Sequence, residues 1–465
     1  MLFRAQNLGP IRDAELDLSK RLIILAGPNN SGKTYLGWAL YGLSHFSKAL
    51  PCVRRLVDAA LASPSGMHEA GSFRAFIIEF TDELCALYAK HIHRDFAATP
   101  DTFTSTLLTL VTDTLAIPVK AAFPRNYETF LQIAFQDHDG ALCVRVQARK
   151  LERRTGNSSA GASVTYIPNE SVLLSSISPE DLDWVANRAS LKLSSELKWA
   201  LFRRSFTIFP VERIATTIFA RELLLRRVEM LDEDGQDADD TADAAPRPVT
   251  GRYPLPIRHS LRAAADLSTV GREETEFSDL ADELEMTVLQ GRVKVSEHGD
   301  MLFFPTASPT RSLGLHQSAS VIKSLSALVY YFRHLATRHN HIIIDEPELN
   351  LHPDNQRKVA RVLAKAANRG IRIMLSTHSD YLIGEFNNLL MLSRDTPQAA
   401  AVRDELGYDA ASVLRPEDVG VYLVNDGLCL PVEVKQTGFE LKTFEDAFHN
   451  MNRDAQTIYN RIFAE

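Results

Sequence analysis

Short alternating runs of apolar and polar residues open the chain. Residues 2–5 and 14–18 alternate in this way on either side of Gly9-Pro10, and the pattern predicts two strands. Residues 21–25 form a short apolar run that is typical of a buried strand. This run ends at a glycine-rich loop, and residues 35–43 predict the helix that follows.

The pattern changes twice in the middle of the chain. Residues 51–122 look helical, whereas residues 130–135 and 141–146 alternate on either side of a polar turn and predict a β-hairpin. A further strand is expected over residues 163–174, and a helical pattern follows to about residue 204. We therefore expect a helical insertion that carries an antiparallel β subdomain.

Residues 232–248 form an acidic segment of small side chains that ends in prolines. Such a segment cannot bury enough apolar area to offset the entropy cost of ordering it, so we expect a mobile surface insertion. The alternative is a DNA-mimicking or partner-binding segment.

Helices and strands alternate in the last third. Phe277, Leu280, Leu284 and Val288 share a helical face, and Gly291 is expected to end that helix. The remaining predictions are a hairpin at 298–300, helices at 321–332 and 353–368, strands at 341–344, 371–375, 419–424 and 430–434, and a closing helix at 444–462. No heptad segment is long enough for a coiled-coil arm.

The composition excludes several classes of protein. The net charge of −8 argues against a chain coated in nucleic acid, although a local basic groove remains open. The four cysteines form no CxxC pair, which argues against a zinc ribbon and fits a reducing compartment. No signal peptide and no run of about 18 apolar residues is present, so we expect a cytoplasmic protein without membrane contact.

A phosphate-binding loop stands directly after the third predicted strand. Gly27 to Thr34 matches G-x-x-x-x-G-K-[ST] in full. Glycines let backbone N–H groups surround phosphate oxygens, and the following helix adds the positive end of its dipole. Lys33 should neutralise phosphate charge, and the Thr34 hydroxyl should bind Mg²⁺. The expected ATP contacts are Gly27, Asn29, Asn30, Ser31, Gly32, Lys33 and Thr34.

Two acids follow an apolar strand at residues 341–344. Asp345 is expected to hold Mg²⁺, and Glu346 to orient and deprotonate the attacking water. His378 stands at the end of the next predicted strand, where a histidine can sense the γ-phosphate; the alternative is a structural histidine. The long separation of these residues from Lys33 excludes compact P-loop folds and implies a large insertion.

Taken together, these residues resemble ABC-type ATPases. The phrases GPNNSGKTYL, IIIDEPELNLHPDNQ and STHSDYLI are typical of a narrower group, the ATPase part of OLD (overcoming lysogenization defect) nucleases and the ATPase subunits of Septu- and PARIS-type antiviral systems. The matching motifs lie in residues 1–45 and 310–395. A weaker match at residues 209–213 implies that Arg213 approaches the nucleotide; the alternative is a buried structural arginine.

The resemblance implies an ATP sandwiched between two heads, with the signature segment of one head capping the γ-phosphate bound by the other. The signature residues expected in trans are Ser318, Ser320 and Lys323, and the D-loop residues are Asn350 and His352. A serine there can instead be a helix N-cap, and His352 can be ordinary helix-entry packing. The segment lacks the glycines of LSGGQ, which puts the tightness of the closed dimer in doubt.

The resemblance also predicts a domain order. It consists of an N-terminal lobe (1–50), an insertion region (51–305, with the hairpin at 127–148 and the acidic loop at 232–248), a C-terminal lobe (306–400) and a small C-terminal module (401–465). The fold class expected is α/β, an ABC-type P-loop ATPase head with a mixed-sheet core, an antiparallel β subdomain and a helical insertion. No DxD pair follows His378, so a Toprim nuclease domain is not expected in this chain.

The function expected is an ATPase with ATP and Mg²⁺ as cofactors. It would act as the nucleotide-dependent sensor or scaffold subunit of a bacterial antiviral defence system. Its partners would be further copies of itself, as a homodimer or higher homo-oligomer, and a separately encoded nuclease or toxin effector. One alternative is a RecF-like repair ATPase that binds DNA through basic clusters such as residues 149–154. The other is a scaffold of slow turnover; a transporter ATPase is disfavoured by the missing LSGGQ.

Overall fold

The computed structural model of the chain describes most of its residues. These are residues 1–63, 67–112, 119–124, 129–138, 141–158, 161–172, 179–202, 206–220, 253–268, 273–441, 453–454 and 456–461. The chain divides into two compact units, which are described separately. Unit 1 comprises Met1–Phe3, Leu43–Ala89 and Leu107–Ser205, and unit 2 comprises Arg4–Gly42, Lys90–Thr106 and Phe206–Glu465.

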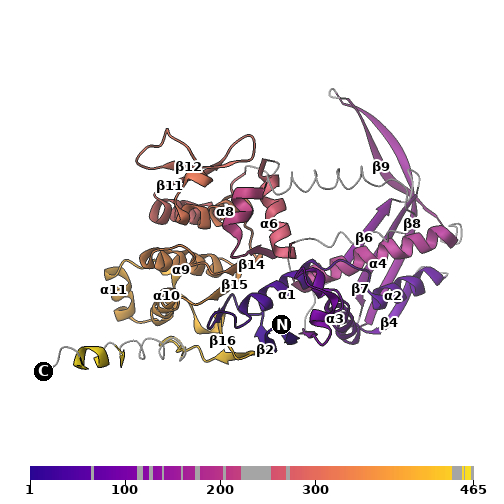
Figure 1. Ribbon diagram of the computed structural model, residues 1–465. Coiled ribbons are helices and arrows are strands. Elements are labelled where there is room, and N and C mark those ends of the chain that lie inside the picture. Colours follow the sequence, from indigo (N-terminus) through magenta and orange to yellow (C-terminus); the bar gives the residue numbers. More distant parts are fainter. Residues whose placement is uncertain are drawn as a thin grey trace, which may run out of the picture. The chain divides into compact units, whose positions relative to one another are not determined.

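A mixed β-sheet forms the centre of unit 2 (Figure 1). Within this unit its strands lie in the order β10-β14-β15-β3-β16-β17-β2-β1. The five strands from β10 to β16 are parallel to their neighbours, whereas β17 is antiparallel to β16. The bounds are β1 Leu2–Leu8, β2 Ile11–Asp17, β3 Leu22–Ala26, β10 Phe206–Phe209, β14 His341–Asp345, β15 Arg372–Thr377, β16 Val419–Asn425 and β17 Leu428–Val432. The predicted α/β class with a mixed-sheet core is confirmed.

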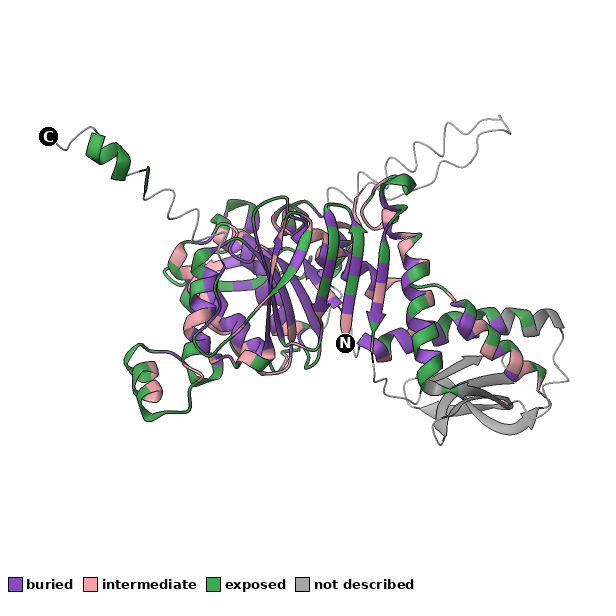
Figure 2. Ribbon diagram, turned by 90° about the horizontal axis from the view of Figure 1, so that it is seen from below, coloured by how far each residue is buried: buried purple, intermediate pink, exposed green. Residues whose placement is uncertain are grey.

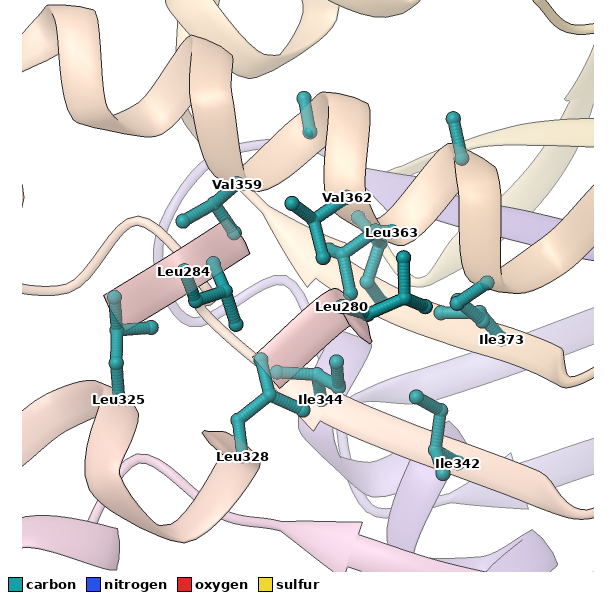
Figure 3. Packing of buried hydrophobic residues seen from close by; sticks show 14 of the residues in the cluster. Leu280, Leu284, Leu325, Leu328, Ile342, Ile344, Val359, Val362, Leu363 and Ile373 are labelled. Atoms are coloured by element: carbon teal, nitrogen blue, oxygen red, sulfur yellow. The ribbon is translucent and has the colours of Figure 1, made fainter. Parts of the chain in front are cut away.

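The central strands are buried on both faces, as Figure 2 shows for most of the sheet. Ile342 and Ile344 of β14 join side chains of α7, α8 and α9 in one apolar cluster (Figure 3). On the other face, a Cβ built on Gly37 of α1 would lie 3.1 Å from Ile343. Burial on both faces explains the unbroken apolar run of this strand. Burying each large apolar side chain contributes about 1.5–3 kcal/mol to the free energy of folding.

Helices flank this sheet, and those predicted at residues 35–43, 321–332 and 353–368 are among them. Their bounds are α1 Lys33–His45, α6 Leu255–Ala265, α7 Ser278–Leu284, α8 Ser320–His334, α9 Pro353–Asn368, α10 Asp380–Met391 and α11 Pro397–Glu405. Residues 213–220 are also helical. The helix expected over 353–368 is confirmed at both ends, since Pro353 stands at its first position and Gly370 behind it takes a left-handed conformation with φ 104°.

A small antiparallel sheet in unit 2 consists of β11 Gly291–Val295, β12 Met301–Pro305 and β13 Leu313–Gly314. It confirms the hairpin predicted at 298–300. The prediction that Gly291 ends the preceding helix is wrong. A π-helical turn at Glu285–Leu289 continues α7, and Gln290 takes the left-handed conformation with φ 53°. Gly291 begins β11, and a side chain there would collide with Phe303, since its Cβ would lie 2.4 Å from that ring.

Unit 1 combines helices with a second antiparallel sheet of order β4-β8-β7-β6, in which β9 also pairs with β8. The helices are α2 Pro51–Ala62, α3 Phe73–Ala89 and α4 Pro179–Phe202, and the strands are β4 Met67–Ser72, β6 Val119–Pro124, β7 Thr129–His138, β8 Ala141–Ser158 and β9 Gly161–Val172. The predicted hairpin and third strand are confirmed.

The helical prediction for residues 51–122 is wrong at β4, at β6 and at β5 (Leu107–Val111). An apolar run as short as that of β5 cannot be assigned to helix or strand by its pattern. The polar strand β4 forms because it pairs with β8, far away in the sequence.

Two predicted segments cannot be compared with the structure. The acidic stretch 232–248 lies outside the described residues, as does most of the closing helix expected at 444–462, of which residues 456–461 are helical. In the part of the chain that the structure describes, no helix combines the length and apolar character needed to cross a membrane.

Candidate active site

Three neighbouring parallel strands of unit 2 end at one edge of the sheet. Asp345 of β14 is in register with Ser376 of β15, and Thr377 of β15 with Ala26 of β3. The residues that follow these strands are Glu346, His378 and Gly27. The sequence motifs that lie far apart along the chain therefore meet at the carboxyl edge of the sheet, which is the usual ligand site of open α/β sheets.

The phosphate loop between β3 and α1 depends on its glycines. Gly27 has φ 149°, and a Cβ there would lie 2.1 Å from the carbonyl oxygen of Val424 in β16. Gly32 has φ 100°, and a Cβ there would lie 2.6 Å from Ile11. A side chain at either position would therefore displace the loop. The loop needs its present shape for its N–H groups to surround a phosphate.

Lys33, the first residue of α1, reaches back over the loop. Its Nζ donates hydrogen bonds to the carbonyl oxygens of Gly27 at 2.9 Å and Pro28 at 2.7 Å. Burial lowers the pKa of Lys33, and the nearby carboxylates of Glu346, Glu348 and Asp345 act in the opposite direction. The ammonium group is thus held inside the loop, beside the N-terminus of a helix, and both features fit a polyphosphate.

Asp345 is buried, with 2% of its surface exposed. Its Oδ1 accepts a hydrogen bond from Ser376 at 2.8 Å, and its Oδ2 accepts one from the Trp38 indole at 3.1 Å. Burial raises the pKa of Asp345 to about 6, although both hydrogen bonds oppose this shift. Thr34 stands one helical turn before Trp38 and so shares its face of α1. A buried carboxylate and a hydroxyl on facing elements fit the hard-oxygen preference of Mg²⁺.

Glu346 and His378 lie side by side at the same edge. The Nδ1 of His378 is 3.6 Å from Oε1 of Glu346, and both side chains are partly exposed. Glu346 has φ 48°, a left-handed conformation that costs a residue with a side chain about 1–3 kcal/mol. The two side chains are therefore neighbours, and their expected roles in the reaction stay a prediction.

Glu348 is a site residue that the sequence interpretation missed. Its Oε1 accepts hydrogen bonds from the Thr377 hydroxyl at 2.7 Å and from the His378 backbone N–H at 3.0 Å. Its other oxygen, Oε2, is buried and has no hydrogen-bond partner among the described residues. Burial raises the pKa of Glu348. The second acid of the Asp-Glu-Pro-Glu phrase was the available signal, and its carboxylate ties the β14 turn to His378.

Arg213 is buried, and its guanidinium group donates only to backbone carbonyls among the described contacts. It reaches Asp345 O and Glu346 O at 2.7 Å each, Ser324 O at 3.1 Å and Pro210 O at 3.2 Å. This is the geometry of the structural arginine that the sequence left open as an alternative. It supports the backbone behind Glu346 and joins it to α8, and its expected contact with ATP stays a prediction.

Replacing Arg213 with alanine should destabilise unit 2, because four carbonyl groups would lose their donor in the interior. We expect the free energy of unfolding to fall by about 3 kcal/mol, measured by urea denaturation. Arg311 is exposed and supplies the control, since Arg311→Ala should change it by less than about 0.5 kcal/mol. Equal stability of the two variants would contradict the supporting role.

The expected signature segment leads into α8. Ser318 is buried and donates to Gly314 O at 3.0 Å, and Lys323 donates to His316 O at 3.1 Å. Ser320 is exposed and begins α8, whereas the N-cap is Ala319, which has no capping side chain. The alternative of a serine N-cap therefore does not hold here. Contact with ATP on a second copy stays a prediction for all three residues.

The expected D-loop residues stand between β14 and α9. Asn350 has φ 61°, and its Nδ2 lies 3.4 Å from the Ser324 hydroxyl of α8. His352 is the N-cap of α9 and accepts a hydrogen bond from Asp354 N at 3.4 Å, although its side chain is 71% exposed. His352 thus has the helix-entry role, and its contact with a second copy stays a prediction.

Trp38 was also missed by the sequence interpretation, and it offers a test of the Mg²⁺ assignment. Trp38→Phe removes the donor to Asp345 and keeps an aromatic ring beside Phe96. Loss of one hydrogen bond of about 1 kcal/mol should raise the Mg²⁺ concentration for half-maximal ATPase activity about fivefold.

Indole fluorescence gives a second measurement of the same change. The fluorescence of the wild type should change when Mg²⁺ and ADP are added, and Trp38→Phe should lose this change. The control Trp199→Phe should keep it, because Trp199 is exposed in unit 1. An unchanged Mg²⁺ requirement in Trp38→Phe would argue against this role.

Comparison with known proteins adds one family match. Residues 271–383 match the family model described as AAA ATPase domain, a segment that includes Asp345, Glu346 and His378. No curated protein matches the chain significantly.

Similar solved structures include three SMC heads, each 11% identical to this chain. The first is an SMC head domain from Thermotoga maritima, covering 93% of this chain and 98% of that chain with a TM-score of 0.30. The second is an SMC head bound to the C-winged helix domain of ScpA, covering 93% of this chain and 96% of that chain with a TM-score of 0.32. The third is an Smc head domain with an extended coiled coil bound to the C-terminal domain of ScpA derived from Pyrococcus furiosus. The match covers 97% of this chain and 98% of that chain with a TM-score of 0.30. Values this low support no inference about function.

The family match covers the acidic strand end and the histidine, and the phosphate loop meets them at the same sheet edge. Together, the match over residues 271–383 and this geometry support an ATPase of the AAA type.

Proposed function

We propose that the chain hydrolyses ATP and acts as the nucleotide-dependent sensor or scaffold subunit of a bacterial antiviral defence system. The observation that carries the ATPase part is the meeting of Lys33, Asp345, Glu346 and His378 at the carboxyl ends of β3, β14 and β15. The defence role and the separately encoded effector rest on the sequence phrases that resemble OLD, Septu and PARIS ATPases.

Each site residue has a role in this proposal. The loop N–H groups and Lys33 bind the phosphates. Thr34 and Asp345 would hold Mg²⁺, which would neutralise charge on the transferred phosphoryl group. Glu346 accepts a proton from the attacking water as the water oxygen bonds to the γ-phosphorus. The bond from the γ-phosphorus to the β–γ bridging oxygen breaks, which leaves ADP and phosphate. His378 donates to a γ-phosphate oxygen, and Glu348 holds the backbone of His378 in position.

The exposed start of α8 supports assembly through a second copy. Ser320 and His352 lie at the surface of unit 2, on elements that Asn350 connects through Ser324. A second head that covers this surface would complete the nucleotide site from outside. ATP would then favour the assembled state and hydrolysis would release it.

A trapping experiment tests this proposal. Glu346→Gln, purified from a native-like host with Mg-ATP, should form a stable homo-oligomer and retain a nuclease-like or toxin-like chain at fixed stoichiometry, identified by mass spectrometry. The same preparation from Lys33→Ala is the matched control and should retain neither. Recovery of DNA or repair proteins alone would instead favour the RecF-like function, and recovery of a membrane permease would contradict both.

A further inference from the structure

An open polar cavity of about 630 Å³ lies in unit 2 at the amino ends of the central strands. Its walls come from the residues before β3 and β16, the end of α9, the segment after α10 and the helix α11. Its charged side chains are Arg21, Arg394, Arg403, Arg415, Asp395 and Asp418. Four guanidinium groups thus share one concave surface with two carboxylates.

The cavity carries positive charge that the described side chains do not neutralise. Asp418 is paired with Arg21 at 3.2 Å, and Arg403 lies 3.7 Å from Asp404. The side chains of Arg394 and Arg415 are exposed and form no ion pair or hydrogen bond with the described residues. In a chain of net charge −8, these two guanidinium groups outnumber the remaining lining carboxylate, that of Asp395, so the hollow is a locally attractive site for anions.

Hydrogen bonds hold the walls of this cavity in place. The Asn368 amide donates to Ala411 O and Val413 O, both at 2.8 Å, and the backbone N–H of Arg21 donates to Asp418 O at 2.8 Å. The lining residue Ser393 has a buried hydroxyl oxygen without a hydrogen-bond partner among the described residues. A wall that is already fixed in this way lowers the entropy cost of binding a ligand.

This cavity is separate from the phosphate loop. Arg21 precedes β3 and Gly27 follows it, so the two residues lie at opposite ends of a five-residue strand, about 20 Å apart at 3.3 Å per residue. None of the cavity's charged residues belongs to the loop or to the acidic strand end. A ligand here would therefore bind beside ATP without replacing it.

We propose that this cavity binds a small phosphorylated anion with at least two negative charges. The planar guanidinium groups of Arg394 and Arg415 match the geometry of phosphate oxygens, and Arg is the side chain that binds such groups bidentately. The hollow shape favours a compact ligand over a nucleic-acid duplex, which needs an extended basic surface.

Calorimetry with inorganic pyrophosphate tests the proposal in the full-length Lys33→Ala variant, whose phosphate loop is disabled. This variant should bind one pyrophosphate, and adding Arg394→Glu with Arg415→Glu should raise the dissociation constant at least tenfold. The matched control adds Arg292→Glu with Arg311→Glu, the same charge change at two exposed arginines outside the cavity, and should stay within twofold.

Three results would overturn the proposal. These are the absence of pyrophosphate binding in Lys33→Ala, equal weakening by the two pairs of substitutions, and a cavity pair that weakens binding of duplex DNA but not of pyrophosphate. If Lys33→Ala fails to fold, the same titration is made on ATP-loaded Glu346→Gln, in which ATP already fills the loop. The proposal does not depend on the ATPase function, so loss of either leaves the other intact.

Discussion

Replacing Glu346 with glutamine is expected to slow ATP hydrolysis by at least roughly 100-fold while ATP remains bound. The amide keeps the size of the side chain and its backbone conformation but cannot accept the proton of the attacking water, and general-base catalysis contributes about 10²–10⁴-fold. Steady-state phosphate release measures the rate, and retention of labelled ATP on a filter measures binding.

Glu417→Gln is the matched control, because Glu417 is exposed at the opposite end of the sheet, before β16. It should leave both measurements unchanged. Residual turnover of Glu346→Gln above about a tenth of the wild-type rate would show that another group activates the water. Glu348, which accepts a hydrogen bond from the His378 backbone, would then be the next residue to replace.

Replacing Lys33 with alanine should weaken ATP binding roughly 100-fold, since charge-assisted hydrogen bonds contribute about 1.5–3 kcal/mol and 1.4 kcal/mol is a factor of ten. Titration with a fluorescent ATP analogue measures the dissociation constant. Lys294→Ala is the control, because Lys294 is exposed and its ammonium lies over the Phe304 ring. If Lys33→Ala binds ATP as tightly as the wild type does, the loop binds nucleotide without its lysine.

Local patterns were sufficient for most elements of unit 2. The phosphate loop, the two acids after β14 and the proline that begins α9 each carry a short-range signal, since glycine, charge and proline restrict the backbone directly. The same holds for the hairpin of β7 and β8, where alternating residues surround a polar turn. These features could be placed from the sequence because neighbouring residues determine them.

Features that depend on distant contacts could not be placed. The terminal strands β16 and β17 read as a hairpin, but nothing in them indicates that β16 pairs in parallel with β3 beside the phosphate loop. Trp38 reads as an ordinary residue of an amphipathic helix until its indole is seen to reach Asp345. Arg213 was recognised, yet its role in bonding the backbone of Asp345 and Glu346 depends on carbonyl positions that no motif encodes.

The place of β3 between β15 and β16 has a consequence for synthesis of the protein. The strand before the phosphate loop is made first, but its two partners lie at Arg372–Thr377 and Val419–Asn425. At 5–20 residues per second, a ribosome needs roughly 20–80 seconds to add about 400 residues. During that time β3 exposes two unpaired edges and an apolar surface, so the nascent chain depends on chaperones or on the solubility of its early segments until β16 emerges.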